Sequence, residues 1–587
     1  MKKFLLVLLV FSFFFFSCGS PTESEDSGAI TFTFDDSPKA RWTGGKPSDD
    51  VKNQLTHLIK LKNGSYSNTV TVEPGAASHT VTGVPLGRLE VTIDAKKNGY
   101  PFAHGATVIS VVKGDNTANV PMERLEQGIV LSQKSGGTYA FPPLTQGYSS
   151  GDLAGVIFAV TNYAENDTGT LTVSSNNTIF TVSPLSIPSI AQDGSAPFTV
   201  TPAANLAVGT HTATISVANT ANGISASFTV SVMVAELLDV HDIASWNTAI
   251  STIKNGGKGK GYAINLTGNF SIAGVTTNTF GSVTGITVII TGNHTITLSG
   301  QGSLLRIGAK QTVILKDAHL EGNSSNNTSL VYISSGTFNM EGGTISGNTG
   351  GGVTLDGETF NMTGGTISGN TTTGGGAVTS SLGDDCGGGV YVSSGTFNMT
   401  GGTIGPNNFA INSGGGVFVD ENGFFTMSGA ATISGNTARR GGGVVDGGGT
   451  IDMEGGTIID NTATLSGGGV AVYLAFNMKS GIISGNTAGS DGGGVCVYGG
   501  TATISGGTIG PGNTATYRGG GVCVLEELPG TLDLKSLDLV NGNTAGTANN
   551  PGNQVYVYDN GGTFKINGSA PSGLDLAKKD GTNYYWP

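Results

Sequence analysis

The sequence is poor in charge, in aromatic residues and in cysteine. Of its 587 residues only 12% are charged and 7% are aromatic, and there are four cysteines. Disordered chains usually carry more charge and fewer aliphatic residues, so the composition argues against a disordered protein. Three cysteines follow Cys18, which is too few for a disulfide framework, and their spacing is not that of a zinc site.

Positive charge is also scarce, because 28 Lys and Arg stand against 41 Asp and Glu. Nucleic-acid binding needs clustered Lys and Arg, so we expect no nucleic-acid partner. Glycine is abundant instead, with 97 residues that lack the strict period of three that collagen requires. Together with many Thr, Ser, Asn and Val, this indicates short strands and tight turns. The composition predicts an all-β chain of several domains or a repeat array.

The one long hydrophobic run lies at the N-terminus, in MKKFLLVLLVFSFFFFSCGS. Its apolar part, residues 4–16, is too short to span a bilayer, which needs about 20 residues. Two lysines precede it, so residues 1–17 are predicted to be a signal peptide. No later segment of the sequence is apolar enough to suggest a membrane span.

The end of this run resembles the lipobox of bacterial lipoproteins, although Phe15 stands where that family prefers Leu. The resemblance implies that Cys18 is lipidated and that the lipid anchors the chain in a membrane at the cell surface. Gly19 follows the cysteine, with no Asp directly after it, which favours the outer membrane of a diderm bacterium. The alternative is an ordinary secretory signal with an incidental cysteine.

Two β-sandwiches are predicted after a short acidic tether, residues 18–28. Residues 29–122 contain alternating strand-like runs such as AITFTF and LEVTIDA, separated by turn residues. Their segment VTGVPLGRLEVTIDA is similar to prealbumin-like and carboxypeptidase-regulatory-like modules. Residues 127–233 have the strand spacing of an immunoglobulin-like sandwich. They resemble the tandem Ig-like modules of bacterial surface proteins, which implies that both domains act as spacers.

A short amphipathic helix is predicted at residues 240–257, with Asp242 as its N-cap. The apolar residues at helical spacing are Ile243, Trp246, Ile250 and Ile253. We expect this helix to cover the open end of the β structure that follows, because an uncovered end exposes apolar side chains and unpaired backbone groups.

The C-terminal part, residues 258–587, is dominated by a repeat, of which GTFNMEGGTISGNTGGGV (336–353) is one copy. The motif GGGV recurs mostly 25 to 27 residues apart, ending at Val353, Val390, Val417, Val444, Val470, Val495 and Val522. Each period contains three short strands separated by Gly- or Asn-rich turns, as one coil of a parallel β-helix requires. We expect Val, Phe, Met and Ile to form interior ladders at a rise of about 4.8 Å per coil, and Asn to form an amide ladder.

This pattern resembles the right-handed parallel β-helix of the pectate-lyase-like superfamily, and also the repeats of polymorphic outer-membrane proteins. GGGV matches the GGA[IV]-type motif of those repeats, whereas FNM and ISGN depart from their second motif, FxxN. The resemblance implies a right-handed parallel β-helix with three strands per coil behind the two sandwiches.

Candidate catalytic and metal-binding residues are few. Enzymes of the resembled superfamily place carboxylates and a basic residue on one outer face, some with calcium. Asp420 and Asp446 fall in adjacent coils with Arg440 nearby, and Asp384 and Asp385 lie in the longest interruption of the repeat. Asp420, Asp446 and Arg440 are candidate catalytic residues, and the alternative is that they are ordinary surface charges. Asp384 and Asp385 are candidate calcium ligands, and the alternative is a solvated turn. No other cofactor is expected.

Two pairs of side chains are predicted to stack on the outside of adjacent coils. Tyr391 and Phe418 share one outward column, where exposed rings can bind sugar rings or a partner surface; packing under a loop is the alternative. Cys496 and Cys523 follow the GGGV valine and are predicted to stack, either as a disulfide or as thiols.

A surface ion pair is predicted between neighbouring coils, because Asp491 precedes one GGG and Arg518 the next. Such pairs contribute about 0–1 kcal/mol.

The expectation from these patterns is a lipid-anchored surface protein whose repeats bind a host or matrix protein or a glycan, without catalysis. The rivals are a polysaccharide-active enzyme, either a lyase or a glycoside hydrolase, and a purely structural envelope component.

Overall fold

The structure is a computed structural model. It describes residues 27–33, 42–43, 53–63, 66–97, 100–118, 120, 122–124, 128–133, 136–164, 166–308, 310–373, 386–525, 530–535, 539–546, 554–558, 563–566, 578–579 and 583–586. The predicted signal peptide, Cys18 and the acidic tether therefore lie outside the described residues, except for the last two positions of the tether. Within them the chain is almost entirely β, as the sequence predicts, and forms two compact units. None of the described helices is long and apolar enough to cross a membrane.

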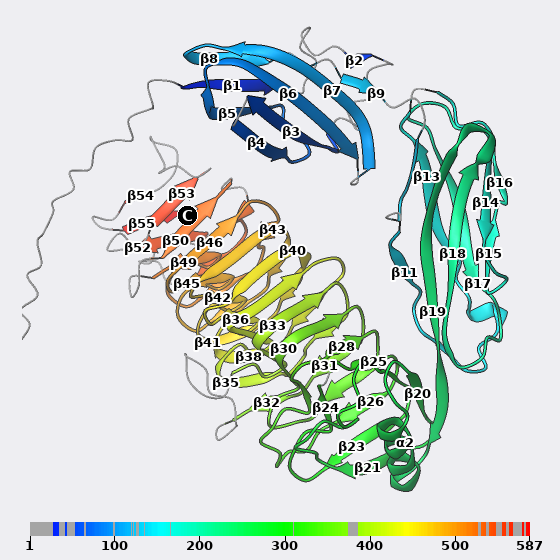
Figure 1. Ribbon diagram of the computed structural model, residues 1–587. Helices are drawn as coiled ribbons and strands as arrows, with labels where there is room; N and C mark the ends of the chain where they lie inside the picture. The colour runs from blue at the N-terminus through cyan, green and yellow to red at the C-terminus, as the bar shows by residue number, and fades with distance from the viewer. Residues whose placement is uncertain are drawn as a thin grey trace, which may run out of the picture. The chain divides into compact units, whose positions relative to one another are not determined.

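The first unit begins with a β-sandwich. One sheet has the order β5-β1-β8 and the other β2-β9-β7-β6-β3-β4 (Figure 1). The strands are β1 (Ser27–Thr33), β2 (Trp42–Thr43), β3 (Leu55–Asn63), β4 (Tyr66–Val72), β5 (Ser78–Pro85), β6 (Gly87–Lys97), β7 (Tyr100–Val111), β8 (Gly114–Ala118) and β9 (Met122–Arg124). Alternate residues of β3 and β6 are buried, because successive side chains of a strand point to opposite faces.

A second sandwich of the same unit has one sheet of order β10-β13-β17-β15, and its other sheet contains β14, β16, β18 and β19. The elements are β10 (Ile129–Leu131), β11 (Thr138–Ala140), η1 (Ser150–Asp152), β13 (Val156–Asn162), β14 (Leu171–Ser175), β15 (Phe180–Ser183), β16 (Ser186–Ile187), β17 (Ser195–Pro202), β18 (Gly209–Asn219), η2 (Thr220–Asn222) and β19 (Ile224–Val240). The short strand β12 (Leu144–Thr145) pairs with the end of β19 and belongs to the second unit. Strand β19 extends past the predicted boundary at residue 233, and its last residues, Glu236 to Val240, are the first strand of the second unit.

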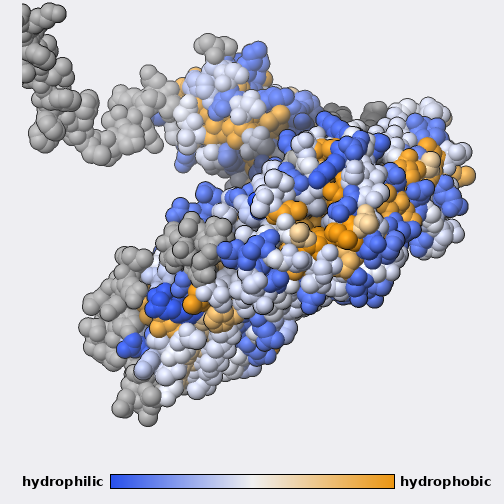
Figure 2. Space-filling model, turned by 90° about the horizontal axis from the view of Figure 1, so that it is seen from below, coloured by the Kyte–Doolittle hydropathy of each residue, from blue (hydrophilic) through white to orange (hydrophobic). Residues whose placement is uncertain are grey.

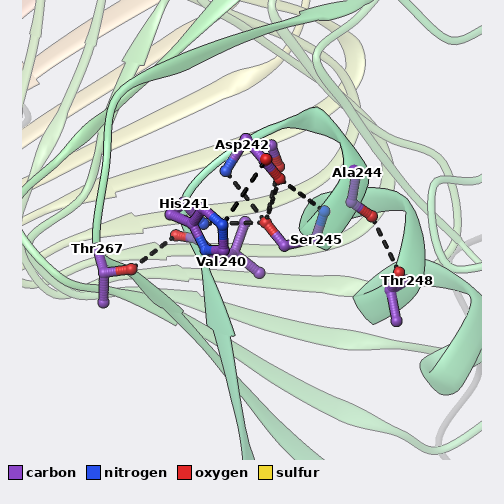
Figure 3. A network of polar contacts seen from close by, with 7 residues as sticks. All are labelled: Val240, His241, Asp242, Ala244, Ser245, Thr248 and Thr267. Carbon is purple, nitrogen blue, oxygen red and sulfur yellow. Dashed lines mark hydrogen bonds and ion pairs between the residues drawn. The ribbon is translucent and has the colours of Figure 1, made fainter.

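The predicted capping helix is present as α2 (Ile243–Asn255). Asp242 is its N-cap: its carboxylate accepts from the Ser245 amide at 2.8 Å and from the Ser245 hydroxyl at 2.7 Å (Figure 3). Trp246, Ile250 and Ile253 are buried against the first coils, in the same cluster as the solenoid interior. Ile243 is 44% exposed, so its predicted place on the buried face is wrong.

The second unit is a parallel β-solenoid of about 11 turns, which confirms the fold class predicted for the C-terminal part. Strands of successive coils pair in parallel and in register, and they form four rows along the solenoid (Figure 1). Row A carries the V-x-V strands that follow GGG, row B the FNM strands and row C the TIS strands. Row D is a short fourth strand that the sequence pattern does not predict.

The bounds of the row A strands are β24 (Leu305–Ile307), β27 (Val331–Ile333), β30 (Val353–Met362), β33 (Val390–Met399), β36 (Val417–Met427), β39 (Val444–Asp446), β42 (Val470–Val472), β45 (Val495–Val497), β49 (Val522–Val524) and β52 (Val555–Tyr558). β30, β33 and β36 continue into row B. β55 (Asn583–Trp586) pairs antiparallel with β52 and with β54 (Lys578–Lys579).

The remaining row B strands are β20 (Gly261–Leu266), β22 (Thr287–Thr291), β25 (Thr312–Leu315), β28 (Thr337–Met340), β40 (Thr450–Ile459), β43 (Ala475–Ser484), β46 (Thr501–Ile504), β50 (Thr531–Leu534) and β53 (Thr563–Ile566). Row C has β21 (Phe270–Ala273), β23 (Thr295–Ser299), β26 (His319–Glu321), β29 (Thr344–Ser346), β31 (Thr366–Ser368), β34 (Thr403–Ile404), β37 (Thr432–Ser434) and β47 (Thr508–Ile509), and it continues through β40 and β43. Row D has β32 (Thr371–Thr372), β35 (Phe409–Ser413), β38 (Thr437–Arg440), β41 (Thr462–Ser466), β44 (Thr487–Ala488), β48 (Thr514–Ala515) and β51 (Thr544–Ala545).

The interior consists of the predicted ladders of identical side chains. Phe338, Phe360, Phe397 and Phe425 stack with ring centroids 5.2, 4.5 and 4.8 Å apart, and none is more than 1% exposed. The Met, Ile and Val ladders belong to the same buried cluster. Each such side chain contributes about 1.5–3 kcal/mol by its burial, so the interior stabilises every coil.

The predicted amide ladder is also present, at the turn between rows C and D. In its centre the side-chain amide of Asn436 donates to Asn461 Oδ1 at 2.9 Å, and that of Asn461 donates to Asn486 Oδ1 at 3.0 Å. The Asn461 amide also donates to the Ile433 carbonyl at 2.9 Å. The ladder continues through Asn348, Asn370, Asn408, Asn513 and Asn543. These contacts satisfy buried backbone groups at a corner where no strand ladder does so.

Candidate functional site

The outward face of row A is formed by the residue between the two valines of each V-x-V strand. In register along the solenoid these residues are Arg306, Tyr332, Thr354, Tyr391, Phe418, Val445, Ala471, Cys496, Cys523 and Tyr556. Several of them form a second hydrophobic cluster, separate from the interior. The outside of row A is therefore largely a covered seam rather than a free surface.

Tyr391 and Phe418 stack as predicted, with ring centroids 5.5 Å apart and an angle of 7° between the rings. However, Tyr391 is 4% exposed and Phe418 is 0% exposed, so the prediction that they form an exposed binding surface is wrong. The covering groups are the glycine-rich turns, because a Cβ added at Gly414 or at Gly447 would clash with Phe418. Packing, the alternative for this pair, is what the structure shows.

Two tyrosines of this seam hold carboxylates of the next coil. The Tyr391 hydroxyl donates to Asp420 Oδ2 at 2.6 Å, and the Tyr332 hydroxyl donates to Asp356 Oδ2 at 2.5 Å. The Arg306 guanidinium lies 3.9 Å from the centroid of the Tyr332 ring. Burial, and then the hydrogen bond to Asp356, raise the pKa of Tyr332 to about 12. Such a hydroxyl stays protonated at neutral pH, and the pair positions the carboxylate.

Asp446 occupies an interior register position instead of an outer one, because it pairs with Val419 on one side and with Val472 on the other. It is 0% exposed. Its carboxylate accepts from the backbone amides of Gly448 at 2.9 Å, Leu474 at 2.7 Å and Ala475 at 2.5 Å. Burial raises its pKa to about 6, although the three amide donors act in the opposite direction.

The candidate catalytic residues thus make their described contacts with different groups. Asp420 binds Tyr391, Asp446 binds backbone amides, and Arg440 lies in row D with its guanidinium 5.5 Å from the ring centroid of Tyr498. Among the described residues no group of three or more His, Cys, Asp or Glu is placed to hold a metal ion. The candidate calcium ligands Asp384 and Asp385 lie outside the part of the chain that the structure describes.

The other two predicted pairs are in register. Asp491 bridges to Arg518 across adjacent coils, with 4.0 Å between carboxylate and guanidinium. The pair is partly buried, with Asp491 only 8% exposed, and burial raises the pKa of this carboxyl despite the arginine. Cys496 pairs with Cys523, both are 0% exposed, and both are thiols in this structure. Burial raises the pKa of Cys523.

The outside of row B, here called the row B face, is partly exposed to solvent along the solenoid. It has two columns, which the register aligns over eight coils. The first column is Thr337, Thr359, Thr396, Phe424, Thr450, Ala475, Thr501 and Thr531, and the second is Asn339, Asn361, Asn398, Thr426, Asp452, Asn477, Thr503 and Asp533. Hydroxyl and amide groups therefore repeat at about 4.8 Å along the solenoid.

The row B face is uncharged over its first four coils, because no ionisable residue stands in either column before Asp452. Neighbouring amides are linked, as where Asn361 donates to Asn339 and Asn398 donates to Asn361, both at 2.9 Å. On the side of the molecule that Figure 2 shows, hydrophobic residues form separate patches among hydrophilic and intermediate ones. The row B face thus offers a fixed lattice of neutral hydrogen-bonding groups.

One residue breaks the threonine column by size and chemistry. Phe424 stands between Thr396 and Thr450 and is 55% exposed, whereas its neighbour Phe425 is 1% exposed in the interior. Two coils further along, Leu474 is 51% exposed beside Ala475. Aligning the repeats on FNM reveals Phe424 in the sequence, since FFTM stands where other copies read TFNM. Phe424 is neither an acid nor part of the outer aromatic pair predicted from the sequence.

The comparisons with known proteins do not identify a family. No family model matches this sequence, and no curated protein matches it. Similar solved structures include a protein of unknown function from Porphyromonas gingivalis W83, with 11% identity over 30% of this chain and 85% of that one and a TM-score of 0.15. The D0-D1 domain of Intimin has 14% identity over 35% of this chain and 97% of that one, with a TM-score of 0.14. The fibronectin(III)-like modules of Clostridium thermocellum CbhA have 11% identity over 34% and 93%, with a TM-score of 0.11. TM-scores this low carry no argument.

Proposed function

We propose that this chain is a lipid-anchored surface protein of a diderm bacterium that binds a ligand on its solenoid without cleaving it. Cys18 carries the lipid in the outer membrane, and the two sandwiches are spacers. The row B face supports the binding role, because it is a regular, partly exposed array of hydroxyl and amide groups on a packed scaffold, uncharged over its first four coils. Groups held in place by a packed interior lose little conformational entropy when a ligand binds, which favours recognition.

The anchor is tested separately from the binding. Cells that express the full chain are compared with cells that express the Cys18→Ala variant, and membrane and soluble fractions are probed for the protein. The proposal expects acyl labelling and membrane association of the full chain, and loss of both in the variant. An unlabelled full chain contradicts the lipid anchor and leaves the ligand-binding proposal standing.

The binding role is tested by exposing the full chain to immobilised matrix proteins, neutral glycans and polyuronates, the last with and without calcium. We expect saturable binding to one of these classes and no shortening of any glycan. Cleavage by the full chain that is lost in the Asp420→Asn variant would establish the rival, a polysaccharide-active enzyme. Asp420 is the residue to replace because it is partly exposed, whereas Asp446 is buried and its replacement also changes the stability of the solenoid. Absence of any ligand favours a structural envelope component.

A further inference from the structure

We propose that the row B face binds the pyranose rings of a neutral glycan, with Phe424 as the platform on which one ring stacks. The inference rests on the proposed binding function and adds the chemical class of the ligand and its place. Three observations carry it: the exposure of Phe424, the mainly uncharged polar lattice around it and the second apolar position two coils away.

The first observation is that the fold does not require Phe424. Thr occupies the same register position in the coils on both sides, and the column contains only one other exception, Ala475. The interior is filled by the Phe425 column, so the ring of Phe424 adds nothing to the core. Phe424 is 55% exposed, so its ring keeps apolar surface in contact with water, which is less favourable than a Thr at the same position. A large apolar side chain left in solvent is typical of a binding surface.

The second observation is the chemistry around the ring. The neighbouring side chains on the row B face are Thr396, Asn398, Thr426 and Thr450, which are uncharged donors and acceptors, and one carboxylate, Asp452. The centre of a protein–protein interface is instead rich in apolar and aromatic groups and depleted in small polar ones. A single aromatic ring within a field of hydroxyls and amides matches a ligand that has an apolar face and a polar rim. A pyranose ring has this shape, because its C–H groups form a face and its hydroxyls form the edge.

The third observation extends the site along the solenoid axis. Leu474, 51% exposed, lies two coils beyond Phe424, which is about 10 Å at the rise of a parallel sheet. The coil between the two contributes Thr450, and the column position beside Leu474 is the small residue Ala475. Leu474 stands one residue before the column, so the arrangement is two apolar contacts in different coils with the Thr450 hydroxyl between them. It fits a chain of linked rings lying parallel to the axis better than a single sugar.

The site is electrostatically suited to a neutral ligand. The first carboxylate of the second column, Asp452, already accepts from the Asn477 side chain at 2.8 Å. Farther from the columns, Glu454 forms an ion pair with Lys479 at 2.8 Å. With net charge −13 over the whole chain, a polyanionic glycan is repelled while a neutral one is not.

The test uses a variant that restores the repeat and therefore preserves the fold. Phe424→Thr introduces the residue that the column carries in the adjacent coils, so its melting temperature is expected to equal or exceed that of the wild type. Ile482→Thr is the matched control, because Ile482 is 46% exposed and replaces Thr in the row C column, between Thr457 and Thr508. Both variants and the wild-type full chain are titrated with neutral β-linked and α-linked oligosaccharides of increasing length.

The expected result is binding of a neutral oligosaccharide by the wild type, a loss of about thirtyfold in Kd for Phe424→Thr, as for truncation of a central aromatic contact, and wild-type affinity for Ile482→Thr. Affinity that rises with oligosaccharide length up to the span from Phe424 to Leu474 also supports the inference. Unchanged affinity of Phe424→Thr overturns it, as does preference for a polyuronate or for a protein. In those cases the proposed binding function survives, whereas absence of any ligand refutes both.

Discussion

Replacement of Asp446 by Asn is expected to remove a pH dependence from the stability of the solenoid. The carboxyl group is fully buried, and burial raises its pKa from 3.8 to about 6. The folded chain therefore holds this proton more tightly than the unfolded chain does. Stability from this group is fully present below about pH 4 and is lost as the pH rises to about 6. The shift of about two pH units corresponds to about 3 kcal/mol, at about 1.4 kcal/mol per unit.

The assay is denaturant unfolding of the wild type and of the Asp446→Asn variant at several values between about pH 4 and about pH 7. The absolute stability of the variant depends on how the amides of Gly448, Leu474 and Ala475 are satisfied, so the informative quantity is the difference between the two proteins. That difference is expected to change by about 3 kcal/mol across the window, with the wild type losing stability relative to the variant as the pH rises. Parallel curves would refute the reasoning that burial outweighs the three amide donors.

Hydrogen exchange gives a local reading of the same prediction, because repeat proteins need not unfold in a single step. The amides of Leu474 and Ala475 donate to Asp446 Oδ2 and are expected to stay protected at about pH 7 in the wild type. Asn does not ionise, so in the Asp446→Asn variant the protection factors of these two amides are expected not to change with pH between about 4 and about 7. Exchange of these two amides at the rate of exposed ones in the wild type contradicts the described contacts.

Three further predictions concern other buried groups. Burial lowers the pKa of His57 to about 4, so the first sandwich is expected to lose up to about 3 kcal/mol as the pH falls from about 6.5 to about 4, and a His57→Gln variant should lack this loss in denaturation at each pH. Asn461→Ala should destabilise the solenoid by about 3 kcal/mol or more, because it removes an acceptor and a donor from the buried ladder. Asn361→Ala, in the exposed ladder, should cost less than about 1 kcal/mol, and equal costs would refute the distinction. Cys496 and Cys523 should react with a thiol reagent only after unfolding, since both are buried; rapid labelling of the native protein contradicts their placement.

The repeat made the interior of the solenoid predictable because every coil carries the same pattern. A ladder needs the same side chain at the same position in each coil, and the recurrence of Phe338, Met340 and Ile345 states this directly. Helix α2 is predictable for a similar reason, because its N-cap Asp242 and the helical spacing of the apolar residues that follow are local signals. Both predictions depend on regularity within a few residues or between identical copies.

The outside of the solenoid is harder to predict, because the residues of a strand do not indicate which turns pack over its outer face. Tyr391 and Phe418 are buried under glycine turns, which the sequence pattern does not place over row A. Asp446 was expected near Asp420, although it stands at the third position of V-x-V, where the register requires an inward side chain. Comparing each copy with the other copies, position by position, locates both Asp446 and Phe424 as departures from the repeat.

The in-register stacking of coils has a consequence for how such a chain can vary. Each coil makes its strand pairs with the coil before and the coil after, and the same Val, Phe, Ile and Asn positions meet at every junction. Loss or duplication of one whole period, such as the 26 residues from Val444 to the residue before Val470, brings equivalent edges together again. A deletion within a strand displaces the ladder positions of that strand, whereas a change of a few residues in a turn is absorbed, because coils of different length stack in register. Recombination between copies can therefore lengthen or shorten the solenoid in whole coils, while its cross-section stays constant.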